Sequence, residues 1–220
     1  GGFYCAKVLE PLGADTAGSR YLDPDGSFPN HIPNPENETA MQSILDAVQE
    51  SKADLGIIFD TDVDRAGAVL SDGTELNRNR IIAMMAAILL REHPGTTIVT
   101  DSITSTGLAA FIRKHGGVHH RFKRGYRNVI NESMRLNREG HDSQLAMETS
   151  GHGALKENYF LDDGAYLVTR LLIELARAKK EGYTLESLIA DLAEPAESKE
   201  FRMNILVPDF KAYGQKIIDE

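Results

Sequence analysis

Three closely spaced aspartates follow a largely apolar run in this sequence. Ala53 to Phe59 predicts a strand buried on both faces, and Asp60, Asp62 and Asp64 alternate through the segment that leaves it. Side chains at i, i+2 and i+4 of an extended segment share one side, and neighbouring carboxylates repel one another unless a cation lies between them. Oxygen ligands select a hard ion, Mg²⁺ before Ca²⁺. The spacing therefore favours a Mg²⁺ site, with a solvated acidic loop as the alternative.

Arg65 follows the third aspartate and could bind a phosphate. Its planar guanidinium matches the geometry of phosphate oxygens. The carboxyl end of a buried strand is also where α/β sheets place their ligand sites. A salt bridge to a neighbouring aspartate is the alternative role for this side chain. The segment from Asp60 to Arg65 is therefore the first candidate for a functional site.

Two known aspartate-rich motifs can be compared with this segment. An EF-hand loop starting at Asp60 requires Gly at its sixth position and Glu at its twelfth, where this chain has Arg65 and Ser71. The haloacid-dehalogenase phosphatase motif, Asp-x-Asp-x-Thr/Val after an apolar strand, fits as far as Asp62 but meets Asp64 at its last position. A sugar phosphatase with Asp60 as the nucleophile, forming an aspartyl-phosphate, is therefore the alternative enzyme class.

The composition limits the class of protein and its partners. With 220 residues, 41% hydrophobic and 26% charged, the chain is typical of a soluble globular protein. Its longest strongly apolar stretch, Ile81 to Leu90, is too short for a bilayer, which needs about 20 residues. The net charge of −9 argues against binding to nucleic acid or to anionic membranes. An anionic small substrate stays possible beside a local basic cluster.

The single cysteine, Cys5, excludes a disulfide framework and a cysteine-rich zinc site. No export leader is recognised before the first structured segment. Both observations favour a cytoplasmic protein. The sequence makes no prediction about the oligomeric state.

Apolar spacing predicts alternating strands and helices, which is typical of an α/β fold. The pattern restarts after Pro94-Gly95. We therefore expect two successive three-layer α/β domains with mixed, mostly parallel sheets, over residues 1–95 and 96–195. A strand from Phe201 to Val207 and a helix from Asp209 to Ile218 predict that residues 196–220 begin a further, truncated unit. The other predicted strands are 53–59, 66–70, 96–100, 118–122 and 143–147, and the other predicted helices are 39–52, 78–93, 105–115, 126–139, 163–180 and 185–192.

The chain resembles the α-D-phosphohexomutases, the family of phosphoglucomutase and phosphomannomutase. The segment from Asp60 to Arg65 is similar to the metal-binding loop of that family, commonly Asp-Gly-Asp-Gly-Asp-Arg, with Thr61 and Val63 in place of the glycines. Glu148-Thr149-Ser150-Gly151-His152 is similar to its sugar-binding loop, Glu-x-Ser-Gly-His. Further matches in the same order are 29–36, 123–126 and 162–164. The resemblance covers the second and third of the four family domains and the start of the fourth.

The resemblance implies a fragment of an isomerase. Family members interconvert hexose 1-phosphates and hexose 6-phosphates through a bisphosphate, with a phosphorylated serine as donor and acceptor. The family segments Thr-Ala-Ser-His-Asn-Pro, which carries that serine, and Arg-x-Ser-Gly-Thr, which binds phosphate, do not occur in these 220 residues. We therefore expect the isolated chain to be inactive. A fragment that binds sugar phosphates without turnover is a further alternative.

The resemblance also implies a role for each matched residue. Asp60, Asp62 and Asp64 would hold the Mg²⁺ that neutralises the phosphoserine, and Arg65 would stabilise the transferring phosphoryl group. His152 would assist proton transfer at the attacking hydroxyl.

The remaining matched residues concern the substrate. Glu148 and Ser150 would bind sugar hydroxyls, and Lys123 would contact the substrate. Alternatives from the residues alone are a helix cap or surface charge for Glu148 and a solvated helix start for Lys123. The family often has His or an aromatic residue where Tyr126 stands. The implied partner is a hexose phosphate; mannose, glucose and glucosamine phosphates are not distinguished.

Overall fold

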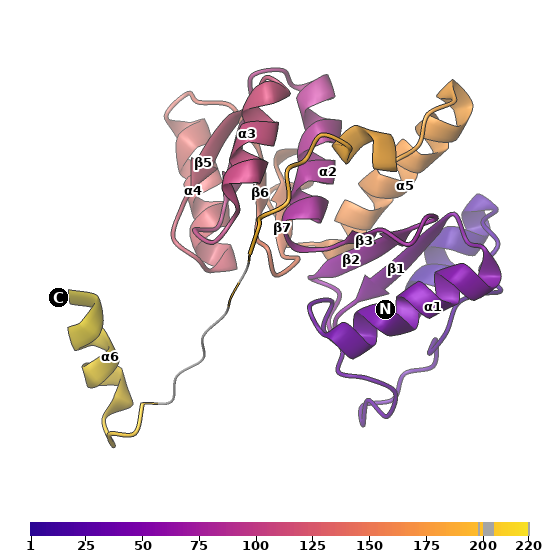
Figure 1. Ribbon diagram of the computed structural model, residues 1–220, viewed down its shortest axis with the longest axis horizontal. Coiled ribbons are helices and arrows are strands. Elements are labelled where there is room, and N and C mark those ends of the chain that lie inside the picture. The colour runs from indigo at the N-terminus through magenta and orange to yellow at the C-terminus, as the bar shows by residue number, and fades with distance from the viewer. Residues whose placement is uncertain (198, 200–204, 220) are drawn as a thin grey trace.

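The first sheet is antiparallel and packs against two helices (Figure 1). Its strands run in the order β1-β2-β3 and span β1 Leu55–Phe59, β2 Ala66–Leu70 and β3 Glu75–Leu76. The connections of six and four residues between them are too short for a crossover helix, so the strands return as hairpins. Helix α1 (Glu38–Ser51) packs on this sheet and is capped by Asn37, whose side chain accepts from the Ala40 amide at 3.0 Å. The computed structural model describes residues 1–197, 199 and 205–219.

The second sheet is mostly parallel and has helices on both faces, which confirms the predicted three-layer α/β class. Its order is β5-β4-β6-β7, and only β7 is antiparallel to its neighbour. Ile98 and Leu145 pack towards α2 and α3, whereas Val99 and Ala146 pack towards α4. The elements span β4 Thr97–Thr100, β5 Val118–Arg121, β6 Ser143–Met147, β7 Gly153–Leu155, α2 Arg78–Glu92, α3 Thr106–Lys114 and α4 Tyr126–Arg138.

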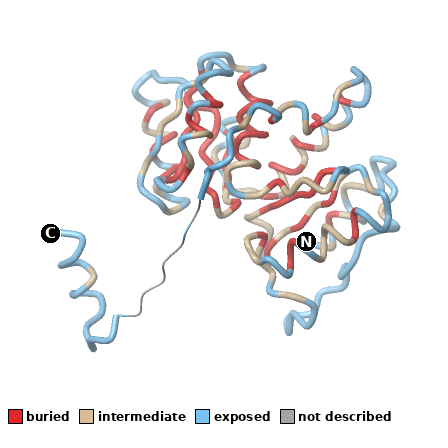
Figure 2. The backbone as a smooth tube through the Cα atoms, in the orientation of Figure 1, coloured by how far each residue is buried: buried red, intermediate tan, exposed pale blue. Residues whose placement is uncertain are grey.

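The boundary predicted at residue 95 lies directly after α2, a helix that does not belong to the first sheet alone. Every residue from Ile81 to Leu90 is buried, and α2 packs against α3 and β6 as well as β3. Its side chains share one core cluster with Leu76 of the first sheet and Leu108 of α3. A helix that is apolar on all sides has no periodicity that shows which sheet it covers. The two sheets are separate, but buried side chains of both units share one core cluster, and Figure 2 shows buried segments in red in each unit.

Helix α5 (Gly164–Glu181) connects the two units. Leu167 and Leu171 enter the core shared with α2, whereas Val168 packs with Tyr4 and Ala66 of the first unit. The Tyr4 hydroxyl lies 2.8 Å from Oγ1 of Thr169. The start of α5 is therefore held by both units, which fixes the loops that precede it.

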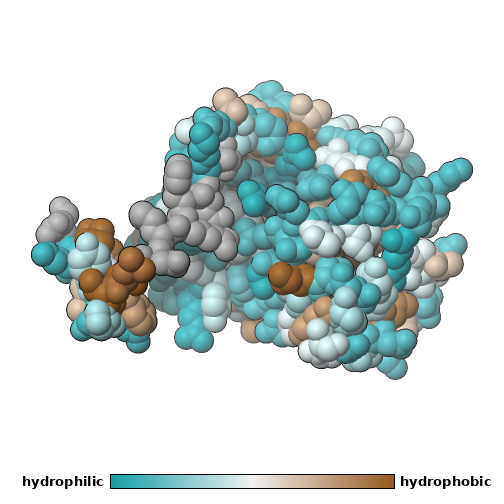
Figure 3. Space-filling model, turned by 60° about the horizontal axis from the view of Figure 1, so that its bottom comes forward, coloured by the Kyte–Doolittle hydropathy of each residue, from teal (hydrophilic) through white to brown (hydrophobic). Residues whose placement is uncertain are grey.

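The remaining segments are short turns and one terminal helix. The predicted helix 185–192 is a 3-10 turn, Glu186–Ile189, and the other short turns are Cys5–Leu9, Glu10–Leu12 and Lys156–Asn158. The strand predicted over 201–207 falls mainly outside the described residues, and 205–207 form no strand. Helix α6 (Phe210–Asp219) agrees with the predicted helix 209–218. It lies apart from the sheets (Figure 1) and exposes apolar side chains, among them Phe210, Ile217 and Ile218. Figure 3 shows brown, hydrophobic surface on this isolated segment.

Within the described part of the chain, no helix combines the length and the apolar character needed to cross a membrane.

Candidate active site

The three aspartates lie on one tight loop between β1 and β2. Asp60 is buried, Asp64 is partly exposed and Asp62 is exposed. Asp60 Oδ1 accepts hydrogen bonds from the backbone amides of Val63 at 3.0 Å and Arg65 at 3.3 Å, so the first aspartate organises the loop that carries the other two. One carboxylate oxygen from each aspartate lies within 4.8 Å of the others.

This arrangement fits a hard divalent cation. The ligands are oxygens only, as Mg²⁺ prefers. Asp64 Oδ1 is buried and has no hydrogen-bond partner among the described residues, which leaves a lone pair for a metal ion. Burial raises the pKa of Asp64 to about 6, with the charge of Asp60 adding to the rise and His152 opposing it. Such a cost of ionisation is what a bound cation would offset.

Val63 adopts a backbone conformation that is unfavourable for a β-branched residue. Its φ is +69°, in the left-handed region where glycine is preferred. The metal-binding loop that this segment resembles commonly has glycine at the same position. The Val63 carbonyl accepts a hydrogen bond from the Gly164 amide at 3.1 Å, at the start of α5. The contact with α5 therefore holds the loop in a strained conformation.

Arg65 is bound to the loop that it follows. Its Nε donates to Asp60 Oδ2 at 2.8 Å, and one terminal nitrogen donates to Asn34 Oδ1 at 3.2 Å. The salt bridge considered as an alternative is thus present in this conformation. Burial opposes ionisation of Asp60, but the hydrogen bonds from Arg65 outweigh it and hold the pKa of Asp60 below its usual range.

The second candidate segment forms a tight turn between β6 and β7. The Glu148 amide donates to the His152 carbonyl at 2.9 Å, and the Gly151 amide donates to the Glu148 carbonyl at 3.1 Å. Gly151 has a φ of +98°, which glycine adopts without strain. The Ser150 hydroxyl donates to Glu148 Oε2 at 3.5 Å, so the two predicted sugar-binding side chains lie side by side.

Glu148 is buried, with 4% of its surface exposed, and receives a hydrogen bond from another helix start. The Gly125 amide, directly before α4, donates to Glu148 Oε1 at 2.5 Å. Burial raises the pKa of Glu148, the Gly125 hydrogen bond opposes this, and the charge of Asp101 adds to it. Lys123, two residues before Gly125, is exposed, and its ammonium lies 5.7 Å from the ring centre of Phe122. Glu148 is therefore not a surface charge, and its carboxylate binds the amide of the residue that precedes α4.

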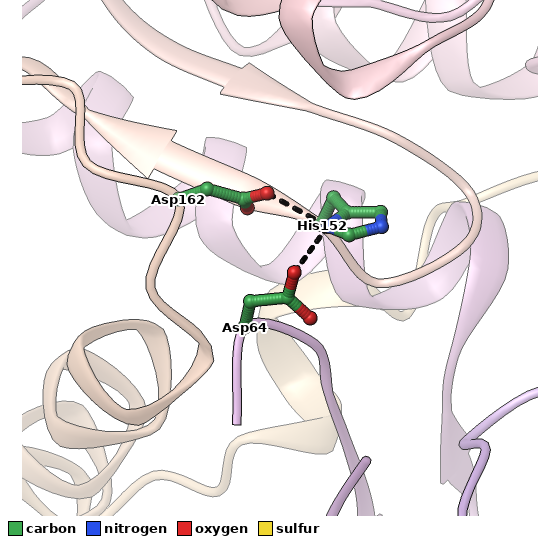
Figure 4. Close-up of side chains that lie close together, drawn as sticks. All are labelled: Asp64, His152 and Asp162. Atoms are coloured by element: carbon green, nitrogen blue, oxygen red, sulfur yellow. Dashed lines mark hydrogen bonds and ion pairs between the residues drawn. The ribbon is translucent and has the colours of Figure 1, made fainter. Parts of the chain in front are cut away.

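His152 lies between two carboxylates that come from different units (Figure 4). Its Nδ1 is 2.8 Å from Asp162 Oδ2 and 3.6 Å from Asp64 Oδ2, and Nε2 points away from both. Burial would lower the pKa of His152, but the hydrogen bond and charge of Asp162 outweigh it and raise that pKa. The imidazole stacks on Tyr126 with ring centres 4.9 Å apart. Its orientation is therefore fixed by Asp162 and by an aromatic ring.

The loop of residues 60–65, called the aspartate loop below, and the turn of residues 148–152, called the sugar-loop turn, meet directly. Arg65 and His152 pair as an isolated antiparallel bridge. Gly151 lies so close to the first sheet that a Cβ there would be 3.0 Å from the Ala66 carbonyl oxygen. The structure thus brings the predicted metal-binding and sugar-binding segments, 84 residues apart between Asp64 and Glu148, into one site.

Two acidic residues of this site were not predicted from the sequence. Asp162 contacts His152, and Asp101 contacts the residue between Glu148 and Ser150. Asp101 directly follows a strand that neighbours β6, which is a detectable signal only when the strand order is known. Asp162 lies in a matched family segment, but nothing in its local sequence indicates a histidine partner.

Family models match both units. Residues 1–73 match "Phosphoglucomutase/phosphomannomutase, alpha/beta/alpha domain II", and residues 77–195 match domain III of the same family. The division between the two matches lies before α2, in agreement with the packing of that helix.

Individual relatives agree with these matches. A phosphoglucomutase of Neisseria meningitidis is 31% identical over the whole chain, and a phosphomannomutase/phosphoglucomutase of Pseudomonas syringae is 33% identical over 97% of it. The chain spans 45% and 44% of these two relatives. Among solved structures, a phosphoglucomutase/phosphomannomutase family protein of Burkholderia thailandensis is 33% identical, with a TM-score of 0.67 over 79% of this chain and 36% of its own. The chain therefore belongs to the phosphoglucomutase/phosphomannomutase family, of which it contains the second and third α/β/α domains.

Proposed function

We propose that the protein containing this chain is a phosphohexomutase that interconverts hexose 1-phosphates and hexose 6-phosphates. The observation that carries this proposal is the Arg65–His152 bridge, which joins the aspartate loop to the sugar-loop turn. A phosphomutase needs a cationic centre for the phosphoryl group beside a fixed site for the sugar. The family membership of the chain supports the same reaction class.

Asp60, Asp62 and Asp64 would hold Mg²⁺, which supplies positive charge to offset the phosphoryl group during transfer. Arg65 adds a second positive charge beside them. Two of its nitrogens are engaged by Asp60 and Asn34, and this holds the guanidinium plane in place for a phosphoryl oxygen. In the family reaction, the phosphoryl donor and acceptor is a serine that these 220 residues do not contain in its family motif.

The sugar-loop turn would hold the hexose. The Glu148 carboxylate can accept hydrogen bonds from sugar hydroxyls, and the Ser150 hydroxyl can donate or accept them. The hydrogen bond between Ser150 and Glu148 keeps the two side chains together. Because Asp162 is bonded to Nδ1, the Nε2 atom of His152 is the nitrogen available to take a proton from a sugar hydroxyl. Lys123 would contribute a positive charge at the substrate side. The single cysteine and this sugar-phosphate chemistry support a cytoplasmic setting.

The test is turnover by the longer protein with glucose 1-phosphate and mannose 1-phosphate, activated by the matching 1,6-bisphosphate. Asp62→Asn is expected to lower kcat about 100-fold, as for the loss of one electrostatic stabiliser of the transition state. Asp23→Asn, which changes an exposed carboxylate far from the loop in sequence, is the matched control. Undiminished turnover in Asp62→Asn would contradict the metal role. A beryllium fluoride adduct on Asp60 would instead support the phosphatase alternative.

A further inference from the structure

Asp101 is a fully buried carboxylate that the proposed mechanism does not use. It directly follows β4, and 0% of its surface is exposed. Its Oδ1 atom has no hydrogen-bond partner among the described residues. A buried polar atom without a partner costs about 1–3 kcal/mol. Burying this oxygen therefore lowers the stability of the fold, and a functional role for Asp101 would explain why the residue is there.

The other oxygen of Asp101 binds the sugar-loop turn. Oδ2 accepts two hydrogen bonds from Thr149, one from its hydroxyl at 2.7 Å and one from its backbone amide at 3.2 Å. Thr149 is itself buried and stands between Glu148 and Ser150. Hydrogen bonds to an ionised acceptor are stronger than those between neutral groups. Both bonds act on the one residue whose position sets the direction of the two sugar-binding side chains.

The sheet brings these residues together. Strands β4 and β6 are parallel neighbours, with Thr100 opposite Met147. Asp101 and Glu148 are the next residues of the two strands, so two buried carboxylates leave the sheet at the same edge. Neighbouring like charges make ionisation less favourable, and the charge of Asp101 is one of the causes that raise the pKa of Glu148. A purely structural anchor for the turn would not require a second carboxylate beside the first.

We propose that Asp101 is a positioning residue for the hexose phosphate: it anchors Thr149 and thereby directs Glu148 and Ser150 towards the sugar. This inference rests on the proposed function. It assigns a task to the hydroxyl of Thr149, which occupies the x position of Glu-x-Ser-Gly-His. The turn keeps its other hydrogen bonds, from Gly125 to Glu148 and from Glu148 to His152, when the Thr149 hydroxyl is removed. A variant at Thr149 should therefore fold.

The first experiment removes and restores the hydroxyl in the longer protein. Thr149→Val has nearly the same shape as the native residue and is expected to raise KM for the hexose phosphate about tenfold, the equivalent of one hydrogen bond. The kcat value should change much less, because Asp101 does not touch the reacting atoms. Thr149→Ser should restore most of the affinity. Thr97→Val, at a buried threonine within β4, should leave KM unchanged.

A double-mutant cycle separates positioning from general stability. If Asp101 acts through Glu148, then Thr149→Val should raise KM far less in a Glu148→Gln background than in the native protein. Asp101→Asn should show the same dependence on Glu148, since it removes the charge and keeps an oxygen at the site. Equal effects of Thr149→Val in both backgrounds would overturn the proposal.

Amide hydrogen exchange of the 220-residue chain tests the anchor without any substrate. The Thr149 amide donates to Asp101, so we expect its exchange to be about tenfold faster or more in Asp101→Asn and in Thr149→Val. Unchanged exchange would overturn the anchoring and would leave the proposed function intact. Faster exchange combined with hexose phosphate affinity that is independent of Glu148 would overturn the sugar-binding role of the turn and, with it, the role of Asp101.

Discussion

The aspartate loop and the sugar-loop turn are built in opposite ways. In the aspartate loop, Asp60 binds amides three and five residues further along, so the loop is organised mainly by its own sequence. The sugar-loop turn depends on residues far away in the chain: Asp101 holds Thr149, and Gly125 holds Glu148. The geometry of the aspartate loop is therefore mainly local, whereas the geometry of the sugar-loop turn depends on the sheet.

The difference has a consequence for strain. The aspartate loop accepts a left-handed Val63 because the α5 contact at Gly164 holds it. The sugar-loop turn has a glycine, Gly151, at its left-handed position and avoids this strain. Its penalty is the Asp101 Oδ1 atom, which has no hydrogen-bond partner in the described part of the chain. Both regions thus carry a local penalty, one in the backbone and one in a buried charge.

The largest expected effect comes from separating the aspartate loop from the start of α5. A Cβ at Gly164 would lie 2.8 Å from the Val63 carbonyl oxygen and 2.8 Å from the Arg65 carbonyl carbon, and backbone atoms cannot move aside easily. We expect Gly164→Ala to lower the free energy of unfolding by about 2–3 kcal/mol, as in overpacked sites. Urea denaturation measures this change. Gly26→Ala, at a glycine with open space around its Cβ position, is the matched control. Equal stability of the two variants would show that the aspartate loop does not need its close contact with α5.

A pH effect is expected in the unit that holds the sugar-loop turn. Burial, with help from the charges of Arg121 and Arg113, lowers the pKa of His119 to about 4 from 6.5. Its Nε2 lies 2.8 Å from the Thr100 hydroxyl, next to Asp101. Between pH 6.5 and 4 the unfolded chain binds a proton that the folded chain does not, so the free energy of unfolding falls as the pH falls through this range. Above pH 6.5 this contribution is constant.

Replacing His119 should therefore flatten the acid limb of the stability curve. We expect His119→Gln to reduce the loss of stability between pH 6.5 and 4 by about 1–3 kcal/mol. Thermal and urea unfolding across this range give the measurement. His141→Gln, at an exposed histidine, should keep the native slope. An unchanged slope in His119→Gln would contradict the partly buried, neutral state of His119.

Because the aspartate loop is organised mainly by its own residues, we expect it to bind metal without help from the sugar-loop turn. We expect weak Mg²⁺ binding by the 220-residue chain, because Mg²⁺ gives up its bound water reluctantly and the three carboxylates supply only part of its coordination shell. Calorimetric titration should show a loss of affinity of about tenfold in Asp62→Asn and native affinity in Ser150→Ala. Equal titrations of Asp62→Asn and the native chain would remove the metal site from this loop.

The smallest expected effect is relief of strain within the aspartate loop. Val63→Gly removes a side chain from a residue with a φ of +69° and should raise the free energy of unfolding by about 0.5–1 kcal/mol, since the relief exceeds the entropy cost of glycine. Val118→Gly, in the edge strand β5, should lower it instead. Destabilisation by Val63→Gly would indicate that contacts of the valine side chain, and not the backbone, dominate at this position.

Much of this molecule followed from the sequence itself. The alternation of strands and helices, the Asp60 to Arg65 loop and the Glu148 to His152 turn were all predicted, because each is written in contiguous residues whose spacing has a direct physical meaning. Tertiary structure decided the rest. The apolar helix α2 could have covered either sheet, and only packing placed it on both cores. The short hairpins made the first sheet antiparallel, and the order β5-β4-β6 brought Asp101 beside Thr149 across 48 residues. The sequence around such a residue does not reveal its partner, because the groups that surround a buried carboxylate come together only when the chain is folded.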